Sequence, residues 1–274
     1  MTTEHRHDSL LAQLNAGIEA LCDSAQWTAY LEMQRRFHRY SSTNVLLIAS
    51  QYPNATQVAG FRTWQKLGRS VRKGERAIWI IAPVITRSPP AVDDERSRSV
   101  TGFRYVAVFD VSQTDGDDLP SPCSKLTGGD AGQWFTRLVG VARDLGYVVE
   151  CAALAEGVNG DCAFELRRIR VEQRNSPAQR VKTLAHELVH ALVHVDQDNR
   201  ALAELEAESA AFVICGHLGL EADAYSFGYV TIWAGGGLRA IAAIKSSCSQ
   251  IERAADTVLE RLEAQEVGAV GAAA

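Results

Sequence analysis

One segment constrains the fold of this chain more than any other. Residues 182–195, KTLAHELVHALVHV, place three histidines and one glutamate largely among Ala, Leu and Val. The Asn-Ser-Pro at residues 175–177 is typical of a helix start, because serine caps the first turn and proline fits its first position. On that helix His186 and His190 stand one turn apart, so both rings project from the same face. The chain must therefore fold around a mostly apolar helix that carries a polar face.

This spacing suits a metal ion, because two imidazoles one turn apart can share one tetrahedral zinc. Glu187 is rotated by about 100° from His186, so it flanks the ion instead of binding it. Together these residues form the HExxH pattern, in which the glutamate is the general base of a metallopeptidase. The alternative is a chance match, since so short a motif recurs across unrelated proteins.

His194 is the third histidine of the segment and a weaker candidate for metal binding. It lies eight residues after His186, which rotates it by about 80°. The longer metzincin motif needs a glycine turn and a more distant histidine, and the sequence has neither. We therefore expect His194 to pack in the core or to support a metal ligand by a hydrogen bond.

The next helical segment, AELEAESAAFV at residues 203–213, offers the third ligand. Glu204 and Glu208 are four residues apart and share a face, whereas Glu206 points elsewhere. An acidic pair on a buried, Ala-rich helix is costly without a cation. One of the pair is therefore expected to bind the metal and the other to hydrogen-bond a ligand histidine. Glu206 is expected on a solvated acidic face.

The two segments together, HExxH followed by E-x-x-x-E, resemble gluzincin-type metallopeptidases. This resemblance implies that Glu204 binds the metal and that Glu208 orients a histidine. Thermolysin-like members have Asp where this chain has Glu, so the two roles could be exchanged. The implied reaction is hydrolysis of peptide bonds by water that Zn²⁺ activates, with His186 and His190 as the other ligands and Glu187 as general base.

Two more parts of such a site are expected on chemical grounds. The developing oxyanion needs a donor, and the nearest candidates in sequence are His217, Tyr225 and Tyr229. An extended peptide could pair with the edge of a sheet. The strand ELRRIRVE, residues 165–172, is the expected edge.

Charge is distributed unevenly along the chain. The net charge is −5, yet residues 26–87 hold ten Lys and Arg against two Glu. This stretch therefore carries +8 and the rest −13, which suits a polyanion as partner of the basic part. Proteins that bind single strands combine such charge with aromatic side chains on which bases stack, and Tyr52, Phe61 and Trp79 lie among the basic residues. The alternatives are a solvated basic face and aromatics that serve only as core.

The same stretch resembles the N-terminal domain of ArdC-type antirestriction proteins. The resemblance runs from FHRYSSTNVLLIASQYPNATQVAGF through RTWQKLGRSVRKGERAIWIIAPV, and VFDVSQTDG at residues 108–116 is similar to the closing strand of that family. It implies that residues 26–120 bind single-stranded DNA and that the companion domain is a zincin. The expected DNA contacts are Arg39, Tyr40, Asn44, Arg62, Trp64, Lys66, Arg69, Arg72 and Lys73.

These observations predict an α+β fold in two domains. Residues 1–125 would form a small α+β domain that binds single-stranded DNA, and residues 126–274 a mainly helical, zincin-like metallopeptidase domain with a small sheet. The boundary is expected in the Gly, Pro and Asp-rich residues 114–132. Residues 9–38 are expected to form one helix. No apolar run approaches the roughly 20 residues that span a bilayer, and no secretory signal is visible, so a cytoplasmic protein without a membrane partner is expected.

The expected function is that of an antirestriction protein that binds single-stranded DNA and cleaves a protein or peptide with zinc. One alternative is a DNA-protective protein in which zinc is mainly structural. Another is a regulatory protease, similar to ImmA/IrrE-type peptidases, that cleaves a repressor. The sequence identifies neither the protein substrate nor the oligomeric state.

Overall fold

The computed structural model describes residues 3–87, 98–117, 131–195, 198–220 and 237–272. The chain divides into two compact units, one of residues 1–17 and 43–120 and the other of residues 18–42 and 121–274. Residues 18–42 thus group with the C-terminal part, and the boundary expected near residue 125 lies outside the described residues. Helices and small sheets together give the expected α+β fold.

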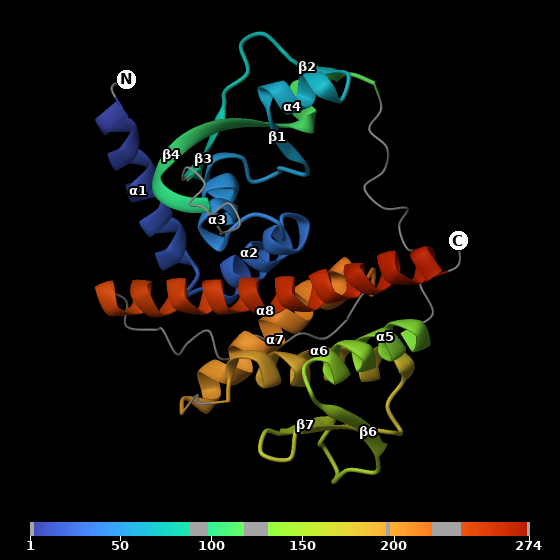
Figure 1. The fold of residues 1–274 in the computed structure, drawn as a ribbon. Coiled ribbons are helices and arrows are strands. Elements are labelled where there is room, and N and C mark those ends of the chain that lie inside the picture. The colour runs from blue at the N-terminus through green and yellow to red at the C-terminus, as the bar shows by residue number, and fades with distance from the viewer. Residues whose placement is uncertain (1–2, 88–97, 118–130, 196–197, 221–236, 273–274) are drawn as a thin grey trace, which may run out of the picture. The chain divides into compact units, whose positions relative to one another are not determined.

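The first unit is built on a long antiparallel hairpin (Figure 1). Its main sheet has the order β1-β4-β3, and β2 pairs with β5 in a second, two-stranded sheet. The elements are α1 (Thr3–Ala20, to residue 17), α3 (Ser42–Gln51, from residue 43), β1 (Val58–Gly60), α4 (Phe61–Lys66), β2 (Arg69–Val71), β3 (Ile78–Arg87), β4 (Arg98–Asp110), the 3-10 turn η1 (Val111–Gln113) and β5 (Thr114–Gly116).

Two side-chain amides fasten α3 to β3. Asn44 accepts from the backbone N–H of Ile81 and donates to its carbonyl, both at 2.8 Å. Gln51, two turns later, makes the same pair of bonds with Trp79 at 2.9 Å. The two amides satisfy backbone groups of a strand edge that would otherwise need another strand. Asn44 is therefore used to hold the fold of this unit.

The second unit is mainly helical with one small sheet. The helix expected over residues 9–38 is two helices, because Asp23 ends the first and caps the second by accepting from the N–H groups of Ala25 and Gln26. The sheet has the order β6-β8-β7, with β6 and β8 parallel and β7 antiparallel to β8. The elements are α2 (Ser24–Arg36), α5 (Ala131–Asp144), β6 (Val148–Ala152), β7 (Gly160–Ala163), β8 (Arg168–Glu172), α6 (Pro177–Val193), α7 (Arg200–His217) and α8 (Gly237–Ala272).

This order corrects one expectation about the substrate strand. The strand within residues 165–172 is β8, which lies in the middle of its sheet, so both of its edges are already paired. The strand at the edge beside α6 is β7. Local sequence pattern marks a strand but does not give its place in the order, which depends on the turn between β7 and β8.

Helix α7 occupies the centre of this unit and contacts α2, α6 and α8 (Figure 1). Its alanines Ala207, Ala210 and Ala211 are fully buried, and their small side chains allow neighbouring helices to approach closely. The indole of Trp27 on α2 donates to Ser209 on α7 at 3.0 Å. Within the described part of the chain, none of the helices combines the length and apolar character that crossing a membrane requires.

Candidate metal centre

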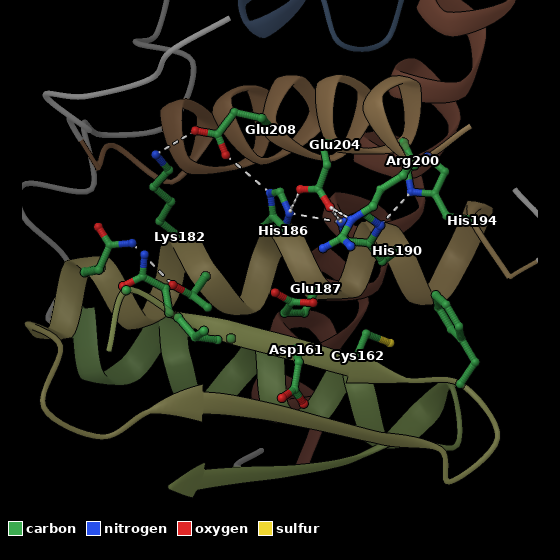
Figure 2. Close-up of a pocket in the computed structure, with 18 residues that line it drawn as sticks. Asp161, Cys162, Lys182, His186, Glu187, His190, His194, Arg200, Glu204 and Glu208 are labelled. Carbon is green, nitrogen blue, oxygen red and sulfur yellow. Dashed lines mark hydrogen bonds and ion pairs between the residues drawn. The ribbon is translucent and has the colours of Figure 1, made fainter. Parts of the chain in front are cut away.

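Two neighbouring helices bring three metal-binding side chains together (Figure 2). Ser176 caps α6 by accepting from the N–H of Gln179, and this start places both histidines of the motif toward α7. The Nε2 atoms of His186 and His190 are 3.0 Å apart. Glu204 lies 3.4 Å from Nε2 of His186 and 3.8 Å from Nε2 of His190.

These separations match the space that one ion needs. Bonds of about 2.1 Å place the donors of a tetrahedral zinc about 3.4 Å apart. The three distances, 3.0, 3.4 and 3.8 Å, are distributed around that value. Nitrogen and carboxylate donors of this kind suit zinc and several other divalent transition metals. The three residues therefore form a donor set that could hold a divalent ion.

Glu208 lies on the other side of His186. Its carboxylate is 3.3 Å from Nδ1 of His186 and 2.8 Å from Nζ of Lys182. By accepting from Nδ1–H it leaves Nε2 of the same ring free of its proton for a metal. The two acids that the sequence left exchangeable thus have different positions, with Glu204 beside both histidines and Glu208 beside one.

The electrostatics of the cluster favour ionised acids. Contacts with His186 and His190 lower the pKa of Glu204 far below its usual value. Burial alone would lower the pKa of His186, but its contacts with Glu204 and Glu208 outweigh burial and raise the pKa to about 9. Without a metal, the cluster holds a proton on this ring, and metal binding would release it.

Glu187 faces the opposite side, toward β7 (Figure 2). The side chain is 7% exposed, and burial raises its pKa to about 7 despite the opposing effect of His186. Gly160 on β7 permits this close approach, because a Cβ there would lie 2.5 Å from the methyl of Thr183 and 3.0 Å from a carboxylate oxygen of Glu187. A side chain at residue 160 would therefore push the edge strand away from the motif helix.

A buried chain of hydrogen bonds extends from His190 to α8. Nδ1 of His194 lies 3.0 Å from Nδ1 of His190, and its Nε2 lies 2.9 Å from Glu206. Ser247 donates to the other oxygen of Glu206 at 2.5 Å. A neutral His194 that donates to Glu206 must accept at Nδ1, so His190 donates its Nδ1–H and keeps the lone pair on Nε2.

This chain corrects the expectation for Glu206 and specifies the one for His194. Glu206 is 2% exposed and not on a solvated face. Its partner Ser247 lies 41 residues further along the chain, and no local pattern indicates which helix packs against that side. His194 has the supporting position that its rotation on the helix indicated.

A cavity of about 720 Å³ lies over the cluster, lined by α6, α7 and residues 157–164 around β7. Arg200 and Cys162 are among the lining residues that sequence reasoning missed. Arg200 stands one turn before Glu204, a spacing that could have indicated it, and its side chain is 93% exposed. Cys162 lies on β7, where burial raises the pKa of its thiol to about 12, so it stays protonated.

Of the three expected oxyanion donors, only His217 lies within the described residues. His217 is absent from the lining of this cavity among the described residues and packs against His38 instead. Tyr225 and Tyr229 lie outside the described residues.

Comparison with known proteins finds a family match in each half of the chain. Residues 2–109 match the model described as the N-terminal domain of anti-restriction factor ArdC. Residues 145–224 match a peptidase family model described as the IrrE N-terminal-like domain. The chain joins an ArdC-type N-terminal domain to an IrrE-like domain. This ArdC-type architecture agrees with the resemblance drawn from the sequence, and the IrrE-like match covers the whole cluster just described.

Individual relatives of this chain are distant. An uncharacterized protein of Bacillus anthracis is 24% identical over 249 residues, which cover 72% of this chain and 41% of that protein. The chain thus spans less than half of that relative. The metal-free crystal structure of antirestriction protein ArdC from the R388 plasmid matches with a TM-score of 0.52 at 22% identity, covering 82% of this chain and 85% of that one. The Mn(II)-bound structure of the same protein has a TM-score of 0.49 at 22% identity, over 85% and 97%.

The residues expected to contact DNA fall into two groups. Three of them in the ArdC-type domain are engaged within the fold, besides Asn44. Trp64 is 2% exposed and donates to the carbonyl of Phe109, so its ring is part of the core, as the alternative interpretation expected. Arg69 donates to Thr114 and to nearby backbone carbonyls. Arg72 pairs with Glu75 at 2.8 Å and with Asp115 at 3.3 Å.

The remaining positions differ in exposure and in the unit to which they belong. Arg62, Lys66 and Lys73 are exposed, and the described part of the chain provides no partner for them. Arg39 and Tyr40 belong to the second unit. Arg39 lies 3.2 Å from Glu263, and burial raises the pKa of the Tyr40 hydroxyl. Arg62, Lys66 and Lys73 therefore remain as the exposed cationic candidates in the first unit.

Proposed function

We propose that this ArdC-type protein is a zinc-dependent metallopeptidase that also binds single-stranded DNA. The observation that supports the enzymatic part best is the spacing of His186, His190 and Glu204 at 3.0, 3.4 and 3.8 Å, beside the buried Glu187. A donor set of two histidines and one glutamate that leaves a position open is the arrangement of catalytic zinc sites.

The residues around the cluster have distinct roles in the proposed reaction. A bound divalent ion would supply a Lewis acid next to the scissile carbonyl. Glu187 takes a proton from the attacking water and returns it to the leaving amine. Glu208 and His194 hold the two ligand rings in orientation through His186 Nδ1 and His190 Nδ1.

The substrate in this proposal is an extended peptide. β7 is at the edge of its sheet and lines the cavity over the cluster. An extended chain can add to such an edge through backbone hydrogen bonds, which bind it without selecting its side chains. Because Gly160 keeps β7 close to α6, a peptide on this edge would pass beside Glu187.

The proposed DNA surface is smaller than the charge count indicates. It consists of Arg62 and Lys66 on α4 and Lys73 in the turn after β2. Phe61 at the start of α4 is 49% exposed, so its ring is available for stacking on a base. Contacts to phosphates by these cations would be independent of sequence and sensitive to salt.

Replacement of Glu187 by Gln tests the enzymatic part. Glu187→Gln keeps the shape of the side chain, removes the base and should leave metal content and DNA binding unchanged. Cleavage of casein and of a mixed peptide library, followed by mass spectrometry, should fall by about 10²–10⁴-fold. The matched control is Glu165→Gln, an exposed position on the turn after β7. Unchanged cleavage by the Glu187 variant would contradict the proposal.

Two other functions are supported by the matched families. The ArdC-type domain favours a DNA-protective protein in which the metal is mainly structural. The IrrE-like domain favours a protease that cleaves a repressor. Protection of incoming DNA that survives Glu187→Gln would support the first, and loss of one transcription factor from cells that express only the wild type would support the second.

A further inference from the structure

A second group of two histidines and one glutamate lies outside the cavity. His38 follows α2, His217 ends α7 and Glu263 lies on α8, and all three belong to the second unit. One donor atom of each lies within 4.8 Å of the others. The rings of His38 and His217 meet edge to face, with centroids 4.5 Å apart. Three segments far apart in sequence therefore bring two histidines and one glutamate together, the same residue types as in the first cluster.

His38 brings a buried ring nitrogen with unused hydrogen-bonding capacity to this group. Its Nε2 atom is buried, and the described residues offer it no hydrogen-bond partner. A buried ring nitrogen without a partner is costly, and such atoms in folded proteins usually meet water or an ion. Burial and the neighbouring His217 lower the pKa of His38 to about 4, so its ring is neutral at pH 7 and has a lone pair to give.

Glu263, the third donor, already forms a weak ion pair with Arg39. Arg39 lies 3.2 Å from Glu263, and the two side chains are 75% and 47% exposed. An exposed ion pair contributes little to stability, so a divalent cation that is held by two imidazoles can displace the guanidinium. Arg39 would then turn to solvent, which its exposure permits.

We propose that His38, His217 and Glu263 form a second binding site for a divalent transition metal ion such as Zn²⁺. Donors of a tetrahedral ion lie about 3.4 Å apart, so donor atoms at the 4.8 Å limit would have to approach each other by about 1.4 Å. Glu263 is on the surface and its side chain can make this movement. Water would complete the coordination.

This site would fasten the segment after α2 to the end of α7 and to α8. An ion that binds only the folded protein stabilises it in proportion to the logarithm of its concentration. The inference does not depend on peptidase activity, because no residue of this group lines the cavity over the motif helix.

Metal counting tests the second site. The full-length protein is stripped with chelator, equilibrated with buffered free Zn²⁺ and measured by mass spectrometry of the metal. The wild type should hold two ions per chain, and His186→Ala should hold one. In the His186→Ala background, Glu263→Gln should remove the remaining ion or weaken its binding at least tenfold. Glu260→Gln, an exposed glutamate on the same helix, is the matched control and should leave that ion in place.

Thermal unfolding gives a second readout that separates this inference from the proposed function. Zn²⁺ should still raise the Tm of the His186→Ala variant, and the rise should disappear in His186→Ala/Glu263→Gln. Because Glu263 is exposed, its replacement should leave the circular dichroism spectrum unchanged. A wild type that holds one ion, lost in His186→Ala, would overturn the second site and leave the first intact. A single ion that survives His186→Ala but not Glu263→Gln would contradict the first cluster instead.

Discussion

The motif helix and the basic segment were both recognised from sequence, but the structure uses their residues differently. His186, His190 and Glu204 converge on one point, with Glu187 beside them. In the basic segment, Arg69 and Arg72 are engaged inside their own unit. The first region gathers side chains that could hold an ion together, whereas the second uses two of its arginines to hold the fold.

The difference teaches what each kind of pattern contains. Spacing on a helix is geometric, so residues four apart must share a face wherever the helix packs. A count of charges contains no geometry. The guanidinium of Arg has five N–H donors in a rigid fork, which suits backbone carbonyls as well as phosphates. A basic stretch therefore overstates the surface that is open to a polyanion.

The largest expected effect is on the motif helix. His186→Ala removes a proposed metal ligand at the first cluster. Loss of a residue that only supports a ligand typically lowers metal affinity by about 10–100-fold, and we expect a larger decrease here. Affinity for a single-stranded oligonucleotide should stay within about twofold, because no exposed cation of the ArdC-type domain is altered. Isothermal titration with metal and fluorescence anisotropy with DNA measure the two effects. A parallel loss of both affinities would remove the contrast between the regions.

The next effect concerns the support of His190. Glu206→Gln removes the acceptor for His194 and should weaken metal binding by about 10–100-fold. A direct readout is the ¹⁵N spectrum of the histidines in the metal-free protein, in which His190 should change from its Nδ1–H tautomer. Glu208→Gln is the comparison variant, since it should alter the signals of His186 and leave His190 unchanged. A Glu206 variant with wild-type His190 signals would show that the buried chain does not set the tautomer.

A smaller effect distinguishes open cations from engaged ones. Replacing Arg62, Lys66 and Lys73 together by Ala should reduce the slope of log affinity against log salt concentration by roughly 2. Each phosphate contact on a single strand contributes about 0.7 to this slope. Arg69→Ala should lower the Tm and leave the salt slope nearly unchanged, because its bonds are internal. Binding measured from 50 to 300 mM salt decides between them. An equal slope change from Arg69→Ala would mean that engaged arginines also meet the DNA.

The smallest effect concerns a charge that neither region uses. Burial, with help from Glu252 and Glu260, raises the pKa of Asp256 on α8 to about 6. The fold thus disfavours the ionised form, so stability is full below pH 4 and is partly lost as pH rises through 6. Asp256→Asn should raise the Tm at pH 7 by on the order of 2 °C and should have no effect at pH 4. A Tm difference that is the same at both pH values would contradict the raised pKa.

Several features of the molecule could be predicted from local pattern and several could not. The helix caps and the histidine spacing could, because they depend on neighbours in sequence. The break before α2 also had a signal, since Asp23 precedes Ser24 as a cap. The partner of Glu206 and the central place of β8 had none. Both are decided by which elements pack together, and this information is distributed over distant parts of the chain.

The placement of residues 18–42 affects how such proteins can be rearranged. Trp27 on α2 is fully buried and bonds to Ser209 on α7, although about 180 residues separate them. Separating the gene near codon 125 would leave the IrrE-like fragment without this helix and expose the apolar side of α7. Recombination that exchanges the C-terminal half between relatives must therefore transfer α2 together with α7. Otherwise the α2 of one relative has to fit the α7 of the other.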